Sequence, residues 1–180
     1  MQQTDLSLAQ QQIRRLAETL PAFGPEAIAD PAANPRLKNY LDFYSLPEPS
    51  DTVQVLAGKL ICGDRQSHLM LWKPSNSKAT AVVVHGYLDH TGLYGHLIRQ
   101  LLDRQFTVVC FDLIGHGLSS GAPASIDSFD EYVEQLNQVL KATADLCPAP
   151  LQGIGQSTGG GILLKQLLQQ GDNRDYPFSS

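Results

Sequence analysis

The start of the chain carries apolar side chains at helical spacing. Leu6, Ile13, Leu16 and Leu20 fall on one face of a 3.6-residue repeat, and Pro21 ends the pattern. Residues at this spacing project from the same side of a helix, so the chain is predicted to begin with one short amphipathic helix. Its apolar stripe must pack against another part of the protein.

Prolines punctuate the next stretch, from Pro21 to Pro49, and no hydrophobic period runs through it. Each proline biases the residue before it away from helical backbone angles. We therefore predict an irregular lead-in that wraps the surface of the domain. This divides the chain into an N-terminal region, residues 1–50, and a globular domain, residues 51–180.

Two extended apolar runs come next, Val53–Ile61 and His68–Trp72. A polar segment separates them and contains Gly63, which can adopt the positive φ that tight turns need. This arrangement predicts an antiparallel β-hairpin whose turn spans Cys62–Ser67.

Beyond the hairpin, continuous apolar runs alternate with helical spacing. The apolar runs are typical of parallel strands covered on both faces, and they are Ala81–Val84, Phe106–Leu113 and Leu151–Gly155. Helical spacing follows each run, at residues 93–102, at 128–146 and from 162 to about 171. Ser128 and Glu131 form the sequence signature of a capping box at the start of the second helix. The alternation predicts an α/β fold, with a mainly parallel sheet, an antiparallel N-terminal hairpin and helices on both faces.

Composition narrows the class of protein. The 180 residues include 13 Lys and Arg against 18 Asp and Glu, for a formal net charge of −5. There is no basic run of the kind that follows a phosphate backbone, so nucleic acid is not an expected partner. No segment approaches the roughly 20 apolar residues of a membrane span, and no signal peptide is recognisable, so we expect a cytoplasmic protein. Three cysteines lack metal-ligand spacing and are expected to be structural.

The third apolar run ends in a candidate nucleophile. Gly155-Gln156-Ser157-Thr158-Gly159 is a G-x-S-x-G motif between a predicted strand and a predicted helix. In that context the serine is expected to lie on a sharp, strained turn that exposes its hydroxyl. Glycines at 155 and 159 are needed because side chains there would collide with the neighbouring strand and helix.

A serine at the start of a helix also has amide hydrogens available to it. The N–H of Thr158 is expected to point to where an oxyanion forms during acyl transfer. A second donor should come from a loop after an earlier strand, and His85-Gly86-Tyr87 directly follows Ala81–Val84. The sequence therefore predicts an oxyanion hole formed by the backbone N–H groups of Tyr87 and Thr158.

Three ordered segments resemble the α/β-hydrolase superfamily, in particular its monoacylglycerol lipase and lysophospholipase branch, which is of the serine aminopeptidase type. They are HGYLDHTGLYGHLIRQLL, VVCFDLIGHGLSSG and GIGQSTGGG, and the resemblance extends from about Val53 to the end of the chain. It implies a serine hydrolase that cleaves monoacylglycerols, lysophospholipids or similar carboxylic esters, without a metal or cofactor. A small-molecule or lipid ester is thus the expected substrate, and peripheral membrane contact by the full-length protein stays open.

The resemblance also assigns roles to loops. It implies that the His85-Gly86 loop supplies the Tyr87 donor and that a second loop sets the shape of the site, with motif residues Asp112, Gly115, His116, Gly117 and Ser119. Family members often have histidine before the nucleophile and methionine after it, where this chain has Gln156 and Thr158. We expect that change only to tune the pocket.

The main departure from the family lies after the nucleophile. The family places a triad acid and then a histidine downstream of the serine, but all five histidines of this chain precede Ser157. Asp172 and Asp175 follow the predicted helix too closely to be the triad acid. We therefore expect an α/β-hydrolase fold that is C-terminally incomplete, lacks the triad acid and histidine, and is inactive alone. The alternative is a non-catalytic fragment or a pseudo-hydrolase that acts as a binding module.

Other residues near the motif have plainer interpretations. His85 lies on the predicted oxyanion loop and is expected to be structural, and His90, His96 and His116 are expected to pack in loops or lie on the surface. Asp112 should hydrogen-bond the turn that follows it. Glycines 153 and 155 break the G-x-G-x-x-G spacing at its last position, which argues against dinucleotide binding. The last strand would leave an apolar edge open to aggregation.

Overall fold

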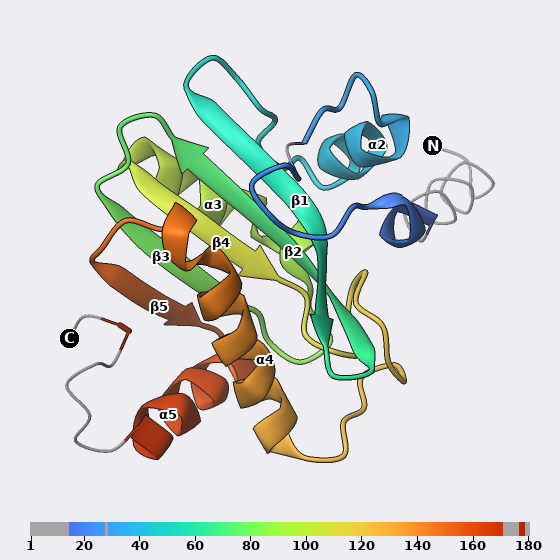
Figure 1. Ribbon diagram of the computed structural model, residues 1–180, viewed down its shortest axis with the longest axis vertical. Coiled ribbons are helices and arrows are strands. Elements are labelled where there is room, and N and C mark those ends of the chain that lie inside the picture. The colour runs from blue at the N-terminus through green and yellow to red at the C-terminus, as the bar shows by residue number, and fades with distance from the viewer. Residues whose placement is uncertain (1–14, 28, 171–176, 179–180) are drawn as a thin grey trace.

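The computed structural model describes residues 15–27, 29–170 and 177–178, and its centre is one twisted sheet (Figure 1). The described strands follow the spatial order β1-β2-β4-β3-β5. Their bounds are β1 Val53–Cys62, β2 Arg65–Pro74, β3 Ala79–Val84, β4 Phe106–Phe111 and β5 Leu151–Gly155. β3 pairs in parallel with both β4 and β5, whereas β2 is antiparallel to β1 and β4. The predicted α/β fold with its mainly parallel sheet is confirmed.

The N-terminal hairpin is confirmed, but its turn is shorter than predicted. β1 ends at Cys62 and β2 begins at Arg65, which leaves Gly63 and Asp64 as the turn. Gly63 has a φ of 63°. Positive φ matches a two-residue turn to the twist of its strands, so residues expected in a six-residue turn lie in the strands instead.

Helices cover both faces of the sheet, as predicted (Figure 1). A 3-10 turn, η1 (Thr91–Tyr94), precedes α3 (Gly95–Asp103), and a second one, η2 (Ala144–Leu146), follows α4 (Phe129–Thr143). α5 covers Thr158–Gln170. The predicted capping box is present, because Ser128 and Glu131 each accept a hydrogen bond at the start of α4. None of the described helices combines the length and apolar content that a bilayer crossing needs.

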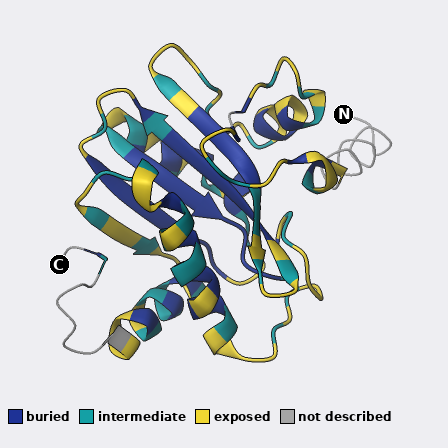
Figure 2. Ribbon diagram, viewed as in Figure 1, coloured by how far each residue is buried: buried dark blue, intermediate teal, exposed yellow. Residues whose placement is uncertain are grey.

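Each face of the sheet has its own apolar core. Figure 2 shows that the central strands are the most buried part of the sheet. On one face, Trp72 and Val83 pack with Leu41 and with Ile98 of α3. On the other, Val82 and Phe111 pack with α4 and with Ile162 of α5. Both sets are fully or almost fully buried. The alternation of side chains along each strand therefore anchors a different helix layer to each face.

The proline-rich lead-in is not irregular throughout, which corrects the prediction. Residues Pro35–Phe43 form a helix, α2, in which Leu37, Tyr40 and Leu41 are buried. Asn34 caps it by accepting the Leu37 N–H, and Pro35 is its first residue. Proline disrupts a helix interior but suits the first turn, because a backbone N–H there would have no partner within the helix. The proline that was taken as a breaker is therefore part of the start signal.

The rest of the lead-in lies against β1. The Phe23 N–H donates to the Lys59 carbonyl, and the Lys59 N–H donates to the Pro21 carbonyl, both at 2.8 Å. Further along, the Trp72 indole N–H donates to the Pro47 carbonyl at 2.9 Å. The first helix was predicted from Leu6, but its beginning lies outside the described residues, and helix is seen at residues 15–19. The two backbone hydrogen bonds to Lys59 cover the outer edge of β1.

The opposite edge of the sheet is β5. All of β3 is buried, whereas every residue of β5 is exposed or only partly buried. On its outer side the described residues provide one parallel bridge, between Leu151 and Phe178. β5 therefore delivers Ser157 to a part of the molecule that is open to solvent.

Candidate active site

Ser157 lies on the turn that joins β5 to α5. Its φ is 49°, in the left-handed region that residues with a side chain rarely adopt. The Gln156 N–H still donates to the Val84 carbonyl at 3.1 Å, and the Gly159 N–H donates back to the Gln156 carbonyl at 2.8 Å. Strand pairing thus continues up to the residue before Ser157, and helical bonding begins immediately after it. A strained serine at such a reversal has the geometry of a nucleophile elbow.

The flanking glycines allow the elbow to form. A Cβ atom added to Gly155 would lie 2.5 Å from the Gly159 carbonyl carbon, and one added to Gly159 would lie 2.0 Å from the Val84 oxygen. Both distances are far below van der Waals contact. A Cβ on Gly160, by contrast, would come no closer than 3.5 Å to the Gly155 oxygen.

The loop after β3 lies against this elbow. A Cβ on Gly86 would be 3.4 Å from the Gln156 oxygen and 3.6 Å from the Ser157 Cβ. Tyr87, the next residue, has an exposed side chain whose hydroxyl donates to the Ala124 carbonyl at 3.3 Å. Among the described residues, the backbone N–H groups of Tyr87 and Thr158 donate no hydrogen bond. Two unused amide donors therefore lie on the two segments that meet at Ser157.

His85 holds the loop after β3 in place. It is buried, its Nε2 accepts the Leu113 N–H at 2.8 Å, and its Nδ1 lies 2.7 Å from the Gly86 carbonyl. Burial lowers the pKa of His85, an effect that the Asp112 charge partly opposes. A neutral ring that donates from Nδ1 satisfies both contacts, so neither nitrogen is free to act on Ser157.

Asp112 joins three segments around the same loop. Its carboxylate accepts the Thr91 N–H at 2.7 Å and the Leu118 N–H at 2.8 Å, and it lies 3.2 Å from His68 Nδ1. Burial by itself would raise the pKa of Asp112, but the hydrogen bond and charge of His68 and the Leu118 N–H hold it below its usual range. The sequence predicted bonds to the following turn, while the links to Thr91 and His68 were missed.

The other histidines also have local contacts. His116 packs against the rings of His85, Tyr87 and Tyr132. His90 caps η1 by accepting the Gly92 N–H at 3.1 Å. His96 is exposed. Within the described residues, no histidine forms a hydrogen bond with Ser157, and no cluster of three or more metal-ligating side chains occurs.

A polar link beside Ser157 was not predicted from the sequence. The Tyr94 hydroxyl lies 3.2 Å from Asp89 Oδ2 and donates a short hydrogen bond to the side-chain oxygen of Gln156. Tyr94 and Gln156 are 62 positions apart in the sequence. Local patterns therefore gave no signal for this contact.

Residues 75–175 match the family described as Serine aminopeptidase, S33. The chain belongs to this family of α/β-hydrolases. The match covers β3, the loop after it, the Asp112 loop and the elbow at Ser157. It also agrees with the resemblance found in the three sequence motifs.

Curated relatives place the chain in the monoacylglycerol lipase-like branch of the α/β-hydrolases. It is 30% identical over 95 residues to a monoacylglycerol lipase of Mycolicibacterium smegmatis, covering 52% of this chain and 34% of the relative. It is 34% identical over 95 residues to the human monoglyceride lipase, covering 52% and 31%. It is 33% identical over 105 residues to the phospholipase YtpA of Bacillus subtilis, covering 57% and 39%. The chain spans about a third of the length of these relatives.

Solved structures show the same α/β-hydrolase fold. Est1E from Butyrivibrio proteoclasticus, solved with ferulic acid bound, aligns with a TM-score of 0.55 at 18% identity, over 63% of this chain and 48% of Est1E. A thermostable carboxyl esterase from Bacillus coagulans aligns with a TM-score of 0.54 at 21% identity, over 68% of this chain and 42% of the esterase. At these identities the likeness concerns the fold alone.

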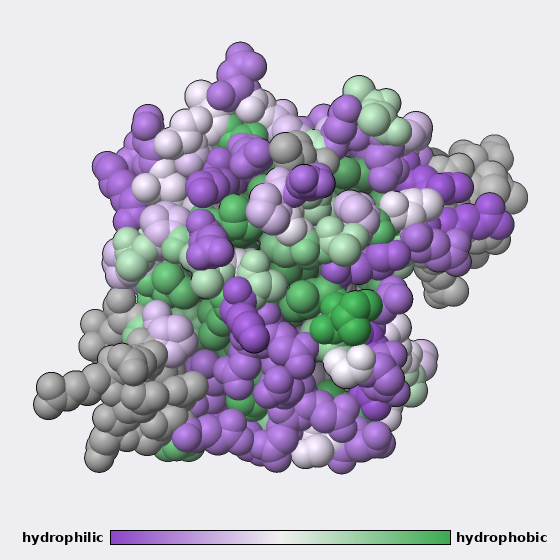
Figure 3. Space-filling model, viewed as in Figure 1, coloured by the Kyte–Doolittle hydropathy of each residue, from purple (hydrophilic) through white to green (hydrophobic). Residues whose placement is uncertain are grey.

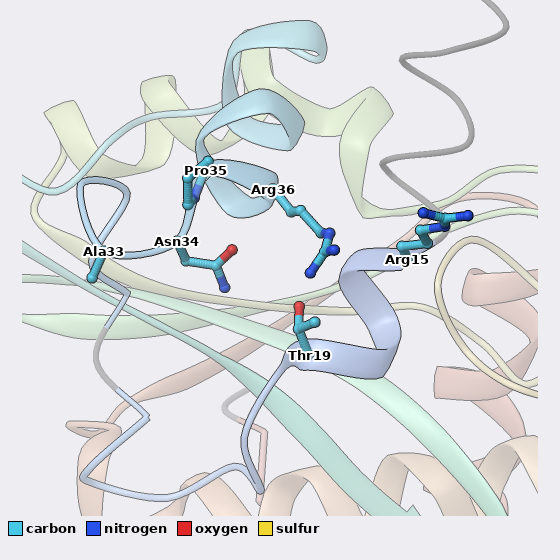
Figure 4. A pocket seen from close by; sticks show the side chains of 6 residues that line it. All are labelled: Arg15, Thr19, Ala33, Asn34, Pro35 and Arg36. Atoms are coloured by element: carbon cyan, nitrogen blue, oxygen red, sulfur yellow. The ribbon is translucent and has the colours of Figure 1, made fainter.

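A further hollow lies away from the hydrolase motifs. It has a volume of about 590 Å³ and lies between the N-terminal helical segment and the start of α2 (Figure 4). It is lined by Arg15, Thr19, Ala33, Asn34, Pro35 and Arg36. None of these residues belongs to the loop after β3 or to the elbow, so the hollow is no part of the candidate site.

Proposed function

We propose that this chain carries the nucleophile and oxyanion hole of a serine ester hydrolase that acts by acyl transfer. The observation that supports this most directly is the positive φ of Ser157, at the reversal from β5 into α5. In the proposal Ser157 is the nucleophile, and the free N–H groups of Tyr87 and Thr158 are the oxyanion donors. His85, Gly86, Gly155 and Gly159 shape the two segments.

The chemistry follows from this arrangement. The Ser157 oxygen attacks the ester carbonyl carbon, and the carbonyl oxygen takes up the negative charge of the tetrahedral intermediate. The two N–H groups stabilise that charge, each by about 2.7–4 kcal/mol. Collapse of the intermediate breaks the bond to the alcohol, which leaves with a proton, and water later releases the acid from the serine.

The substrate class comes from the relatives. Their names specify monoacylglycerols and phospholipids, and we extend this to monoacylglycerol or lysophospholipid-like carboxylic esters for this chain. Three exposed apolar side chains on the loop after β3 and on η1 are compatible with such substrates, namely Tyr87, Leu88 and Leu93.

The base that activates Ser157 is not among the described contacts. All five histidines precede Ser157 in the sequence, and those beside the oxyanion loop, His85 and His90, are engaged by backbone groups. A serine hydroxyl without a base is a weak nucleophile at neutral pH. We therefore propose that the 180 residues alone turn over esters poorly, and that the triad acid and histidine lie outside them.

Covalent labelling tests the nucleophile. A fluorophosphonate probe should label the natural gene product that contains these residues, and peptide mapping should find the label on Ser157. A Ser157→Ala variant should not be labelled, while Ser75→Ala, which removes an exposed serine hydroxyl directly after β2, should retain most of the labelling. Equal labelling of the wild type and Ser157→Ala, or none of the wild type, would contradict the proposal.

A second candidate function is a non-catalytic binding module. It is favoured by the lack of a described histidine at Ser157. In that case, the purified 180 residues would bind an ester without turnover. Ester hydrolysis by these residues that disappears in Ser157→Ala would rule the binding module out.

A further inference from the structure

Three polar side chains from two segments meet beside Ser157. Asp89 lies in the oxyanion loop, Tyr94 is the last residue of η1, and Gln156 precedes the nucleophile. The Tyr94 hydroxyl contacts both of the others, at 3.2 Å from Asp89 Oδ2 and at a shorter distance from the Gln156 side-chain oxygen. We call this trio the Asp89–Tyr94–Gln156 clamp.

The clamp joins parts that are otherwise held separately. The oxyanion loop is tied to the end of β4 by His85 and Asp112. The elbow is tied to β3 by the Gln156 N–H. Among the described residues, the Tyr94 contact with Gln156 is the only side-chain hydrogen bond between residues 85–94 and residues 155–159. It therefore bridges the two segments that bear the proposed oxyanion donors.

The Tyr94 hydroxyl keeps its proton at neutral pH. Burial, helped by the Asp89 charge, raises the pKa of Tyr94 to about 12. The phenol is therefore neutral and can donate a hydrogen bond. It has one proton for two acceptors, but the Gln156 amide can turn so that its NH₂ group donates to Tyr94 while Tyr94 donates to Asp89. In both arrangements the three side chains stay linked.

We propose that Tyr94 is a positioning residue, and that the Asp89–Tyr94–Gln156 clamp fixes the gap between the Tyr87 N–H and the Ser157 hydroxyl. The proposal rests on the proposed function, because that gap matters only if both groups act on one carbonyl. Oxyanion donors act at about 2.7–3.1 Å, so a loop that drifts by about 1 Å loses most of their effect. The sequence predicted only that Gln156 tunes the pocket. In this proposal it also holds Tyr94.

Amide hydrogen exchange on the 180-residue chain tests the link directly. The Asp89 N–H donates to the Gly86 carbonyl at 3.2 Å and reports on closure of the loop. Tyr94→Phe and Gln156→Leu should each speed exchange of the Asp89 amide by roughly 2- to 13-fold, the range expected for loss of one hydrogen bond. Tyr132→Phe is the matched control, because it removes the hydroxyl of another buried tyrosine, which donates to the Ile114 carbonyl at 3.5 Å and has no described contact with Asp89, Tyr94 or Gln156.

Coupling separates a clamp from two independent contacts. The double variant with Tyr94→Phe and Gln156→Leu should exchange no faster than either single variant, because both remove the same link. Gln156→His should restore most of the protection, since an imidazole nitrogen can replace the amide as a partner for Tyr94. Asp89 exchange in Tyr94→Phe that equals the Tyr132→Phe rate, or single effects that add, would overturn the clamp.

Labelling kinetics connect the clamp to function. In the natural gene product, Tyr94→Phe should slow the maximal rate of fluorophosphonate labelling about tenfold while leaving the half-saturating probe concentration unchanged. A wild type that is never labelled would overturn the proposed function, whatever the exchange results. Normal labelling of Tyr94→Phe beside a labelled wild type would overturn the positioning role alone.

Discussion

Backbone space at single positions controls whether the elbow can form. Ser157 adopts a left-handed φ, which costs about 1–2 kcal/mol for a residue with a side chain. That strain persists because Gly155 and Gly159 let the strand, the turn and the helix approach each other more closely than any side chain would permit. The strain of the turn is therefore offset by the packing of the strand and helix around it.

Two adjacent glycines provide a test of this view. Gly159→Ala should destabilise the fold by about 1–3 kcal/mol, because its Cβ would overlap the Val84 carbonyl. Gly160→Ala should be neutral or stabilise α5 by up to about 1 kcal/mol, since alanine is the better helix former. Urea unfolding of the two variants measures the difference, and equal midpoints would contradict the close approach.

Contacts at this scale differ in how far the sequence predicts them. Gly155, Ser157 and Gly159 lie within five consecutive positions, so their joint geometry could be predicted from a local motif. Tyr94 and Gln156 are 62 positions apart. Their contact depends on the packing of β3 against β5, and a single sequence holds no signal for that distance.

The Asp112 carboxylate links three secondary-structure segments. Its buried carboxylate joins β2, η1 and the loop after β4 through His68, Thr91 and Leu118. Each of these elements also contacts the apolar core. Removal of the charge would therefore loosen the positions of three elements at once.

The acid dependence of stability should reveal this carboxylate. The folded pKa of Asp112 lies below its usual value near 3.9, so between the two values the unfolded chain holds a proton that the folded chain does not. The contribution of Asp112 to the free energy of unfolding should thus be complete above about pH 5 and decrease as the solution is acidified through this window. Asp112→Asn should cost about 3 kcal/mol at pH 7, and that difference should shrink at pH 3.

The control for this measurement is Asp145→Asn, which changes an exposed carboxylate. It should leave the dependence on pH close to that of the wild type. A difference between Asp112→Asn and the wild type that is as large at pH 3 as at pH 7 would show that the carboxylate charge is not what stabilises the contacts.

Elements were predicted where their signals are local. The capping box of Ser128 and Glu131 marked the start of α4 correctly, because both partners lie in one helical turn. α2 was missed, since Pro35 was weighed as a breaker although Asn34 before it forms a cap. The hairpin turn was drawn too long for a related reason: polar residues such as Arg65 and Gln66 lie in β2 and pair with β1.

At the scale of the whole molecule, the two edges of the sheet are unequal. β1 is covered by the lead-in, whereas the described part of the chain gives β5 a single bridge, to Phe178, on its outer side. α5 beside it exposes Leu164 by 57% and Leu168 by 72%. On the face that α4 and α5 partly cover, Figure 3 shows apolar side chains gathered in a band across the middle. Such surface promotes association between copies of a chain.

Self-association should therefore depend on α5. A double variant with Leu164→Lys and Leu168→Lys should stay monomeric at roughly tenfold higher concentration than the wild type, with its stability changed by no more than about 0.5 kcal/mol. Ile61→Lys is the control, because it replaces an equally exposed apolar residue, 61% exposed, at the hairpin. Light scattering across a concentration series measures this, and equal effects at the two places would argue against α5.

The pairing of Pro21 and Phe23 with Lys59 gives the lead-in a place in the sheet. A boundary at residue 50 marks a change in composition, but hydrogen bonds between the lead-in and β1 cross it. Protein engineers who cut there would strip hydrogen bonds from one flank of β1 and take from the Trp72 indole its carbonyl partner, Pro47. Among the described residues, β1 would then have as few partners on its outer side as β5 has.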